Sequence, residues 1–119
     1  MSSPKGTILV VEDEALIAMS IESTLQELGF DALIASTIEE AHAHLATAEI
    51  RLAVLDYKLR EGKTTGIAEA LRDRRIPFVV CSGSQFSDIA AVFDGAPVLS
   101  KPFTDDLLSS AVTTALGAD

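Results

Sequence analysis

The chain has 119 residues, the size of one common domain, and no tryptophan among the 48% of its residues that are hydrophobic, so we expect one aliphatic core. Its formal net charge of −9 argues against direct binding of nucleic acid, because phosphate backbones are bound by clustered Lys and Arg. The single cysteine, Cys81, excludes an internal disulfide and is typical of a reducing compartment, and no apolar run approaches the roughly 18 residues of a membrane span. We therefore expect a cytoplasmic protein that binds neither nucleic acid nor a membrane.

Short apolar runs alternate with segments of helical periodicity along the first half of the chain. Residues 7–11 ("TILVV") are continuous, apolar and β-branched, as in a strand buried on both faces. Apolar residues at helical spacing follow until Gly29, where we expect the first helix to end. Residues 31–36 predict a second strand. Ser36 and Thr37 each stand three residues before a glutamate, which is the signature of a capping box and predicts a second helix that ends near residue 47.

The second half of the chain continues this alternation. Its last helix has a threonine as the expected N-cap and two aspartates in the first turn, where the helix dipole favours negative charge. In order, we expect a strand over 51–56, a polar loop to about 64, a helix around 66–74, a strand over 76–82, a short helix between about 87 and 93, a strand over 96–100 and a helix over 104–116.

Five strands that alternate strictly with five helices predict an α/β fold, a doubly wound parallel sheet with helices on both faces, in one domain over residues 1–119. In such sheets the carboxyl ends of the strands converge at one edge, and sites form there. The polar residues that follow the strands are Glu12, Asp13 and Glu14 after the first, Asp56 at the end of the third, Ser82 and Gly83 after the fourth, and Lys101 after the fifth.

Each of these residues alone has an ordinary explanation as a turn former or a solvated side chain, but together they favour a reactive site. Gathered carboxylates repel one another, which raises the proton affinity of at least one unless a cation lies among them. Such oxygen ligands suit Mg²⁺ or Mn²⁺. Asp56 beside the ion could attack a phosphoryl group, whose oxygens Lys101 and the Ser82 hydroxyl would then stabilise.

The motifs "ILVVEDE", "LAVLDYKL", "VVCSG" and "SKPF", in this order, resemble those of the response-regulator receiver domains of two-component signalling, which are CheY-like. The resemblance covers essentially the whole chain. It implies a flavodoxin-like (βα)5 fold with strand order 2-1-3-4-5. It also implies that Asp56 is the phosphoacceptor and that the metal is bound by Glu12, Asp13, Asp56 and the main-chain carbonyl of Lys58. The Lys58 side chain would tune the lifetime of the phosphoryl group or be solvated, and we favour the solvated position.

The same resemblance assigns roles near the ends of the fourth and fifth strands. Ser82, Gly83 and Lys101 would contact the phosphoryl group. The side chain of Ser84 would flank that group and help set its lifetime. The resemblance also implies a cis peptide bond between Lys101 and Pro102.

Three features depart from the usual receiver pattern. Val98 stands where receivers carry an aromatic residue, so the usual switch, in which a hydroxyl residue such as Ser82 is coupled to that aromatic, cannot operate with these residues. Arg60 replaces a common proline. Residues 77–83 ("PFVVCSG") partly match the FAT GUY subclass of single-domain receivers, to which we assign the chain as a prediction. Because the fourth helix is short, we also predict that residues 84–95 are mobile at rest and become ordered on activation.

We therefore interpret the chain as a stand-alone receiver, because it ends just past the last helix, with no output domain. It would accept a phosphoryl group from the phosphohistidine of a histidine kinase, or from a histidine phosphotransfer protein, in a Mg²⁺-dependent reaction. It would signal to an unidentified protein through the face of the fourth helix, fifth strand and last helix, as a monomer or weak dimer. It would not be an enzyme beyond self-phosphorylation and slow autodephosphorylation. A phosphate sink or a phosphorelay intermediate remain alternatives.

Other interpretations fit the residues less well. A flavin-binding protein would need a glycine-rich phosphate loop after the first strand, where this chain has acids. A phosphatase of the haloacid type would need a nucleophilic aspartate there with a second acid two residues on, and Glu12 and Glu14 are a poor match to that pattern. An interaction module independent of phosphorylation has no need of the acids or Lys101. His42 and His44 are two residues apart on a helix and face different directions, so we expect surface residues, and we expect Cys81 in the core.

Overall fold

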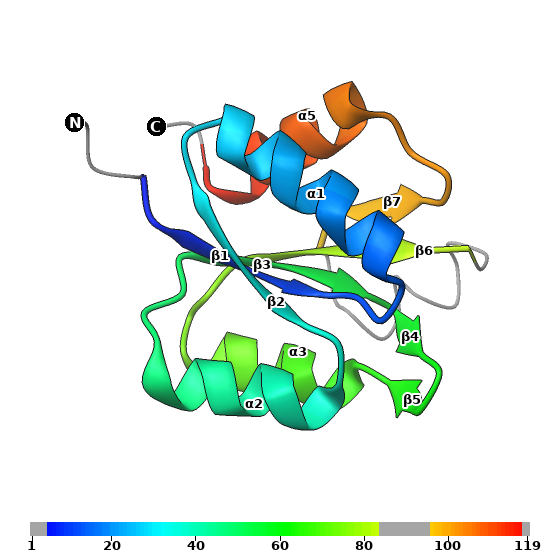
Figure 1. The fold of residues 1–119 in the computed structure, drawn as a ribbon. Helices are drawn as coiled ribbons and strands as arrows, with labels where there is room; N and C mark the ends of the chain where they lie inside the picture. Colours follow the sequence, from blue (N-terminus) through cyan, green and yellow to red (C-terminus); the bar gives the residue numbers. More distant parts are fainter. Residues whose placement is uncertain (1–4, 84–95, 118–119) are drawn as a thin grey trace.

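The structure is a computed structural model that describes residues 5–83 and 96–117. Its centre is a five-stranded sheet in which all neighbouring strands are parallel (Figure 1). The predicted strand order 2-1-3-4-5 is confirmed, since β6 and β7 are the fourth and fifth strands of this sheet. In sheet order the strands are β2 (Asp31–Ala35), β1 (Thr7–Val11), β3 (Leu52–Asp56), β6 (Phe78–Ser82) and β7 (Val98–Ser100).

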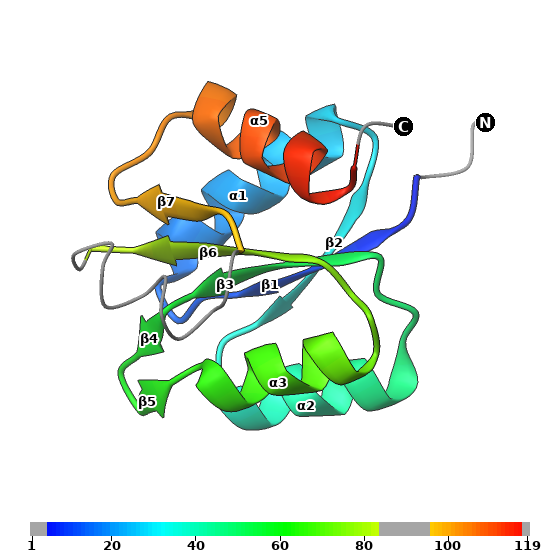
Figure 2. The same ribbon diagram turned by 180° about the vertical axis from the view of Figure 1, so that it is seen from behind.

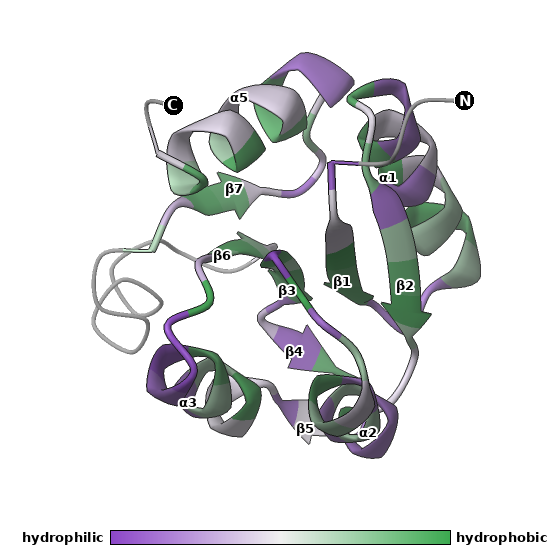
Figure 3. Cartoon of the chain, turned by 90° about the vertical axis from the view of Figure 1, so that its left-hand side faces the viewer, coloured by the Kyte–Doolittle hydropathy of each residue, from purple (hydrophilic) through white to green (hydrophobic). Residues whose placement is uncertain are grey.

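Helices cover both faces of the sheet, as the sequence predicts (Figures 1 and 2). One face is covered by α1 (Ala15–Glu27) and α5 (Asp105–Ala115), and the other by α2 (Ile38–Thr47) and α3 (Thr65–Asp73). Figure 3, which views the molecule end-on, shows these two helical layers on either side of the strands. The predicted helix between about 87 and 93 lies outside the described residues. No helix in the described part of the chain is long and apolar enough to cross a membrane.

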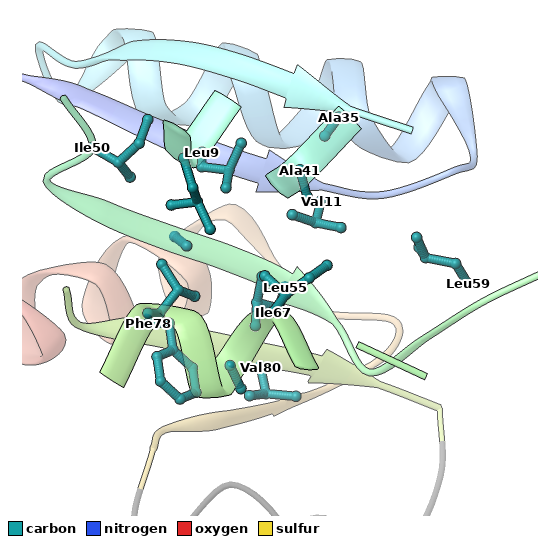
Figure 4. Packing of buried hydrophobic residues seen from close by; sticks show 14 residues of the cluster. Leu9, Val11, Ala35, Ala41, Ile50, Leu55, Leu59, Ile67, Phe78 and Val80 are labelled. Carbon is teal, nitrogen blue, oxygen red and sulfur yellow. The ribbon is translucent and has the colours of Figure 1, made fainter. Parts of the chain in front are cut away.

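The interior strand β1 is buried on both faces, which explains its uninterrupted apolar run. Ile8 and Val10 pack into the cluster under α1 and α5. Leu9 and Val11 pack into the cluster under α2 and α3, together with residues of β3 and β6 (Figure 4). Because successive side chains of a strand point to opposite faces, one five-residue segment supplies both halves of the core.

Both predicted N-caps are present. The Thr37 hydroxyl accepts a hydrogen bond from the Glu40 main-chain N–H at 3.0 Å, and the Glu40 carboxylate accepts one from the Ser36 N–H at 2.8 Å. Thr104 accepts a hydrogen bond from the Leu107 N–H at 3.2 Å at the start of α5. These bonds satisfy main-chain donors that a helix leaves unpaired in its first turn.

Two predicted segments differ from the structure. The predicted polar loop after Asp56 contains an antiparallel hairpin of β4 (Lys58–Leu59) and β5 (Gly62–Lys63), anchored because Leu59 is only 1% exposed. The fifth strand of the sheet begins at Val98 rather than at residue 96, because Pro97 has no N–H to donate to a neighbouring strand.

Candidate functional site

Three carboxylates meet at the carboxyl edge of the sheet. Glu12 and Asp13 follow β1, and Asp56 ends β3, its direct neighbour, whose register pairs Val11 with Leu55. One oxygen from each acid lies within 4.8 Å of the others. Glu12 is 2% and Asp56 9% exposed, while Asp13 is half-buried. The cluster therefore combines two acids withdrawn from water with one that faces it.

The ammonium of Lys101 bridges two of these acids. Its Nζ lies 2.8 Å from Oε1 of Glu12 and 3.2 Å from Oδ2 of Asp56. Lys101 follows β7, and its N–H donates to the Ser82 carbonyl at 2.8 Å, which aligns it with the end of β6. The peptide bond between Lys101 and Pro102 is cis. The lysine thus links the ends of β1, β3 and β7 at one edge of the sheet.

Glu12 is the closer of the two acids to Lys101. Its second oxygen, Oε2, accepts a hydrogen bond from the Glu14 N–H at 3.1 Å. Both Glu12 oxygens are therefore engaged. The oxygen of Asp56 that does not face Lys101 and the half-buried Asp13 are better placed to meet an incoming group.

The charge of this cluster suits a divalent cation. Three ionised acids (−3) and Lys101 (+1) sum to −2, the charge that one divalent ion neutralises. Carboxylate oxygens are hard ligands of the kind that Mg²⁺ and Mn²⁺ prefer. The carboxylates of Glu12, Asp13 and Asp56 therefore fit the predicted metal in charge and in ligand chemistry.

The uncompensated charge also perturbs the ionisation of Asp56. Burial, followed by the negative charge of Glu12, raises the pKa of Asp56 to about 6, although Lys101 opposes the shift. Burial lowers the pKa of Lys101, but its hydrogen bond to Glu12 and the charges of both acids raise it overall above its ordinary value. Lys101 is therefore a permanent cation, while Asp56 exchanges its proton near neutral pH.

Two supports of the site were missed by the sequence argument. Thr64 is fully buried, and its hydroxyl lies 2.7 Å from the carbonyl oxygen of Asp56 and 3.1 Å from that of Tyr57, to which it can donate. The carboxylate of Asp13 accepts a hydrogen bond from the Arg60 N–H at 2.7 Å. The position of Thr64 just before the third helix was the sequence signal for its supporting hydroxyl. No sequence pattern indicated the hydrogen bond from the Arg60 N–H to Asp13.

The other predicted site residues lie around this cluster. Ser82 is buried at the end of β6, Gly83 is exposed beyond it, and the Lys58 side chain is exposed at the start of β4. Val98, at the position of the missing aromatic, is half-buried against the core cluster that contains Val80. Ser84 and the predicted mobility of residues 84–95 lie outside the described residues.

The weaker candidates lie away from the site. Cys81 is a core residue, and burial raises the pKa of its thiol to about 12, which keeps it protonated. His42 is exposed. His44 is half-buried rather than a surface residue, with Nε2 3.3 Å from the Ile34 carbonyl oxygen, because β2 lies beside that end of α2.

Comparison with known proteins agrees with this geometry. Residues 8–113 match the response regulator receiver domain family. The chain is 31% identical over 101 residues to the photosynthetic apparatus regulatory protein RegA of Rhodobacter capsulatus, covering 81% of this chain and 55% of that protein. It is 33% identical over 107 residues to the phosphate regulon transcriptional regulatory protein PhoB of Pseudomonas aeruginosa, covering 82% of this chain and 46% of that one. The chain thus spans about half the length of these relatives.

Solved structures match over nearly the whole chain. The solution structure of SdrG from Sphingomonas melonis Fr1 is 41% identical, with a TM-score of 0.82, and the match covers 99% of this chain and 100% of that one. A response regulator receiver protein from Sinorhizobium medicae WSM419 is 31% identical, with a TM-score of 0.86 and 94% of both chains covered. Fold and site together define a phosphoacceptor domain of two-component signalling. The chain belongs to the response regulator receiver domain family.

The raised pKa of Asp56 predicts a pH-dependent cost in stability. The folded chain holds the Asp56 proton more tightly than the unfolded chain does, so this carboxyl lowers stability as the pH rises from about 4 to above 6. Without divalent cations, Asp56→Asn should raise the free energy of unfolding by about 1–2 kcal/mol at pH 7.5 and by much less at pH 4. Urea titrations at both pH values measure this, with the exposed Asp73→Asn as control. A gain that is equal at both pH values would contradict the prediction.

Thr64 offers a test of how the acceptor strand is supported. Thr64→Val keeps the shape but removes the only hydroxyl donor that faces the carbonyls of Asp56 and Tyr57 among the described residues. We expect a loss of about 1–3 kcal/mol in the free energy of unfolding, because a buried polar group then lacks its partner. Thr64→Ser, which keeps the hydroxyl, should lose less. Equal losses in the two variants would show that packing, not the hydrogen bond, matters.

Proposed function

We propose that this chain accepts a phosphoryl group on Asp56 from a phosphohistidine of a histidine kinase or of a histidine phosphotransfer protein. The observation that carries the proposal is the position of Lys101, whose Nζ lies 2.8 Å from Glu12 and 3.2 Å from Asp56 at the carboxyl edge of the sheet. Membership of the receiver family supports it, because such domains are signalling phosphoacceptors rather than typical enzymes.

The chemistry follows from the two Asp56 oxygens. Oδ2 faces Lys101, so the other oxygen attacks phosphorus. The new O–P bond forms as the P–N bond to imidazole breaks, and the electron pair of that bond returns to the imidazole nitrogen. Lys101, the Ser82 hydroxyl and the Gly83 N–H stabilise the phosphoryl oxygens, whose negative charge grows in the transition state. The raised proton affinity of Asp56 makes its ionised oxygen a better nucleophile.

The metal belongs to the same proposal. Glu12, Asp13, Asp56 and the main-chain carbonyl of Lys58 would hold Mg²⁺ or Mn²⁺, as the carboxylate cluster supports. The bound ion would neutralise the repulsion between these carboxylates and the incoming phosphoryl oxygens. Slow hydrolysis of the resulting aspartyl phosphate would return the chain to rest.

The signal would leave through the face that includes β7 and α5, together with the fourth helix predicted from the sequence. Val98 lies in β7 against the core, so the transmitted change there is a shift in packing rather than the swing of an aromatic side chain. Membership of the FAT GUY subclass stays a prediction. The downstream partner is a protein of unidentified kind, and a phosphate sink or a phosphorelay intermediate are the alternative roles.

The central test is uptake of a phosphoryl group. Incubation with Mg²⁺ and acetyl phosphate should add the mass of one phosphoryl group to the wild-type chain, and a chelator should prevent it. Asp56→Asn should abolish uptake and Lys101→Met should reduce it strongly, whereas Asp73→Asn, on the exposed end of α3, should behave like wild type. Intact-mass spectrometry measures all four. No uptake by the wild type, or undiminished uptake by Asp56→Asn, would refute the proposal.

The lifetime of the aspartyl phosphate tests the role of Lys58. Because its side chain is exposed, we expect Lys58→Ala to change the half-life by less than about twofold. The half-life is measured by following loss of the phosphoryl mass after the phosphodonor is removed. A larger change would place this side chain against the phosphoryl group instead.

A further inference from the structure

Cations gather at the amino-terminal edge of the sheet, the edge opposite the one that holds the acidic cluster. Lys5 precedes β1, Arg51 precedes β3, and three arginines lie at the end of α3 and in the turn before β6. This edge therefore holds five of the nine Lys and Arg residues of a chain whose net charge is −9, namely Lys5, Arg51, Arg72, Arg74 and Arg75.

Three of these cations line two adjoining hollows, which we call the amino-edge hollows. The first, of about 540 Å³, is lined by Lys5, Arg51 and Arg74, and the second, of about 350 Å³, by Lys5 and Arg51. Both hollows also have apolar walls. These comprise Ile50 and Ile76 in the first and Leu28, Phe30 and Leu116 in the second.

The fold holds each of the three cations in place. The Lys5 ammonium lies over the ring of Phe30, 5.8 Å from its centroid. Arg51 donates from Nη1 to the Lys5 carbonyl at 3.2 Å, and Arg74 donates from Nη1 to the Leu45 carbonyl at 2.6 Å. Each arginine uses one N–H in this way, and the guanidinium group has others to offer.

Two glycines give the side-chain stems room. Gly6 has φ +133°, and a Cβ there would lie 3.1 Å from Cδ of Arg51. Gly29 has φ +97°, and a Cβ there would lie 3.3 Å from Cε of Lys5. The side-chain stems of Arg51 and Lys5 therefore lie directly against the main chain at Gly6 and Gly29, where a larger residue would crowd them. The charged groups at the ends of these stems stay exposed to solvent.

All three of these cations are exposed to solvent. Among the described residues, none of Lys5, Arg51 and Arg74 forms an ion pair, although the chain has 18 acids for 9 basic residues. Glu49, which lines the first hollow, is not paired with them either. Cationic groups that line the same hollows without an ion-pair partner attract an anion that enters there.

We propose that the amino-edge hollows bind a carboxylate-bearing peptide segment of a protein partner. Its carboxylates meet Lys5 and Arg51, which both hollows share, and its flanking apolar side chains enter the hollows on either side. The apolar walls favour a peptide over a free phosphate, which would leave them empty. The proposal is independent of phosphorylation at Asp56.

The test uses the acetylated peptide Gly-Ile-Asp-Glu-Leu-Gly and its control Gly-Ile-Asn-Gln-Leu-Gly, titrated into isotope-labelled protein. The acidic peptide should shift the amide resonances of Lys5, Gly6 and Arg51, and the effect should weaken as salt is added. Arg51→Met and Arg74→Met keep the stems but remove the charge, and each should lower the affinity roughly two- to fivefold. Lys63→Met, at the opposite edge, is the matched control and should bind like wild type.

Several outcomes would overturn the proposal. These are equal binding of the amide control peptide, no change in Arg51→Met and Arg74→Met when both retain the wild-type melting temperature, and no shift at all with the acidic peptide. Inorganic phosphate or phosphatidylglycerol vesicles that shift the same resonances while the peptide does not would assign the hollows to another anion. Peptide binding that requires both the acids and the arginines supports it.

Discussion

The contact of Lys101 with Glu12 and Asp56 is the interaction on which the rest of the site depends. Two buried carboxylates from neighbouring strands would repel each other strongly without a cation between them. The ammonium comes from a third strand end, so the balance exists only when β1, β3 and β7 are in register. The electrostatic requirement of the site and the topology of the sheet are therefore one constraint.

Lys101 offsets the negative charge of Glu12 and Asp56 only in part, and this affects the reactivity of Asp56. Burial and the charge of Glu12 outweigh the effect of Lys101, so Asp56 keeps a pKa of about 6 and a high affinity for a proton. The same property favours bonding of its oxygen to another electrophile, such as phosphorus. The Thr64 hydroxyl supports the main chain at Asp56, and the Arg60 N–H supports the carboxylate of Asp13. The Asp56 carboxyl therefore lowers the stability of the fold and is also the group that would react.

The sequence predicts the sheet, the strand order and the edge at which the acids meet, because buried parallel strands have continuous apolar runs and converging carboxyl ends. It does not predict that Glu12 is the nearer partner of Lys101, since that depends on side-chain rotamers in the packed site. The hairpin of β4 and β5 has strands of two residues, too short for any period to show. Thr64 could equally have been a solvated residue, because burial of a hydroxyl has no local pattern.

The two central strands each join a fixed cation to a fixed anion. Lys5 stands before β1 and Glu12 after it, and Arg51 stands before β3, which ends on Asp56. At about 3.3 Å per residue the two ends are roughly 20 Å apart, well beyond the Debye length of about 8 Å at physiological salt. The cations of one edge therefore do little to offset the acids of the other. The strands β1 and β3 connect the acidic cluster to the amino-edge hollows directly, so packed main chain is the shortest route for any coupling between them.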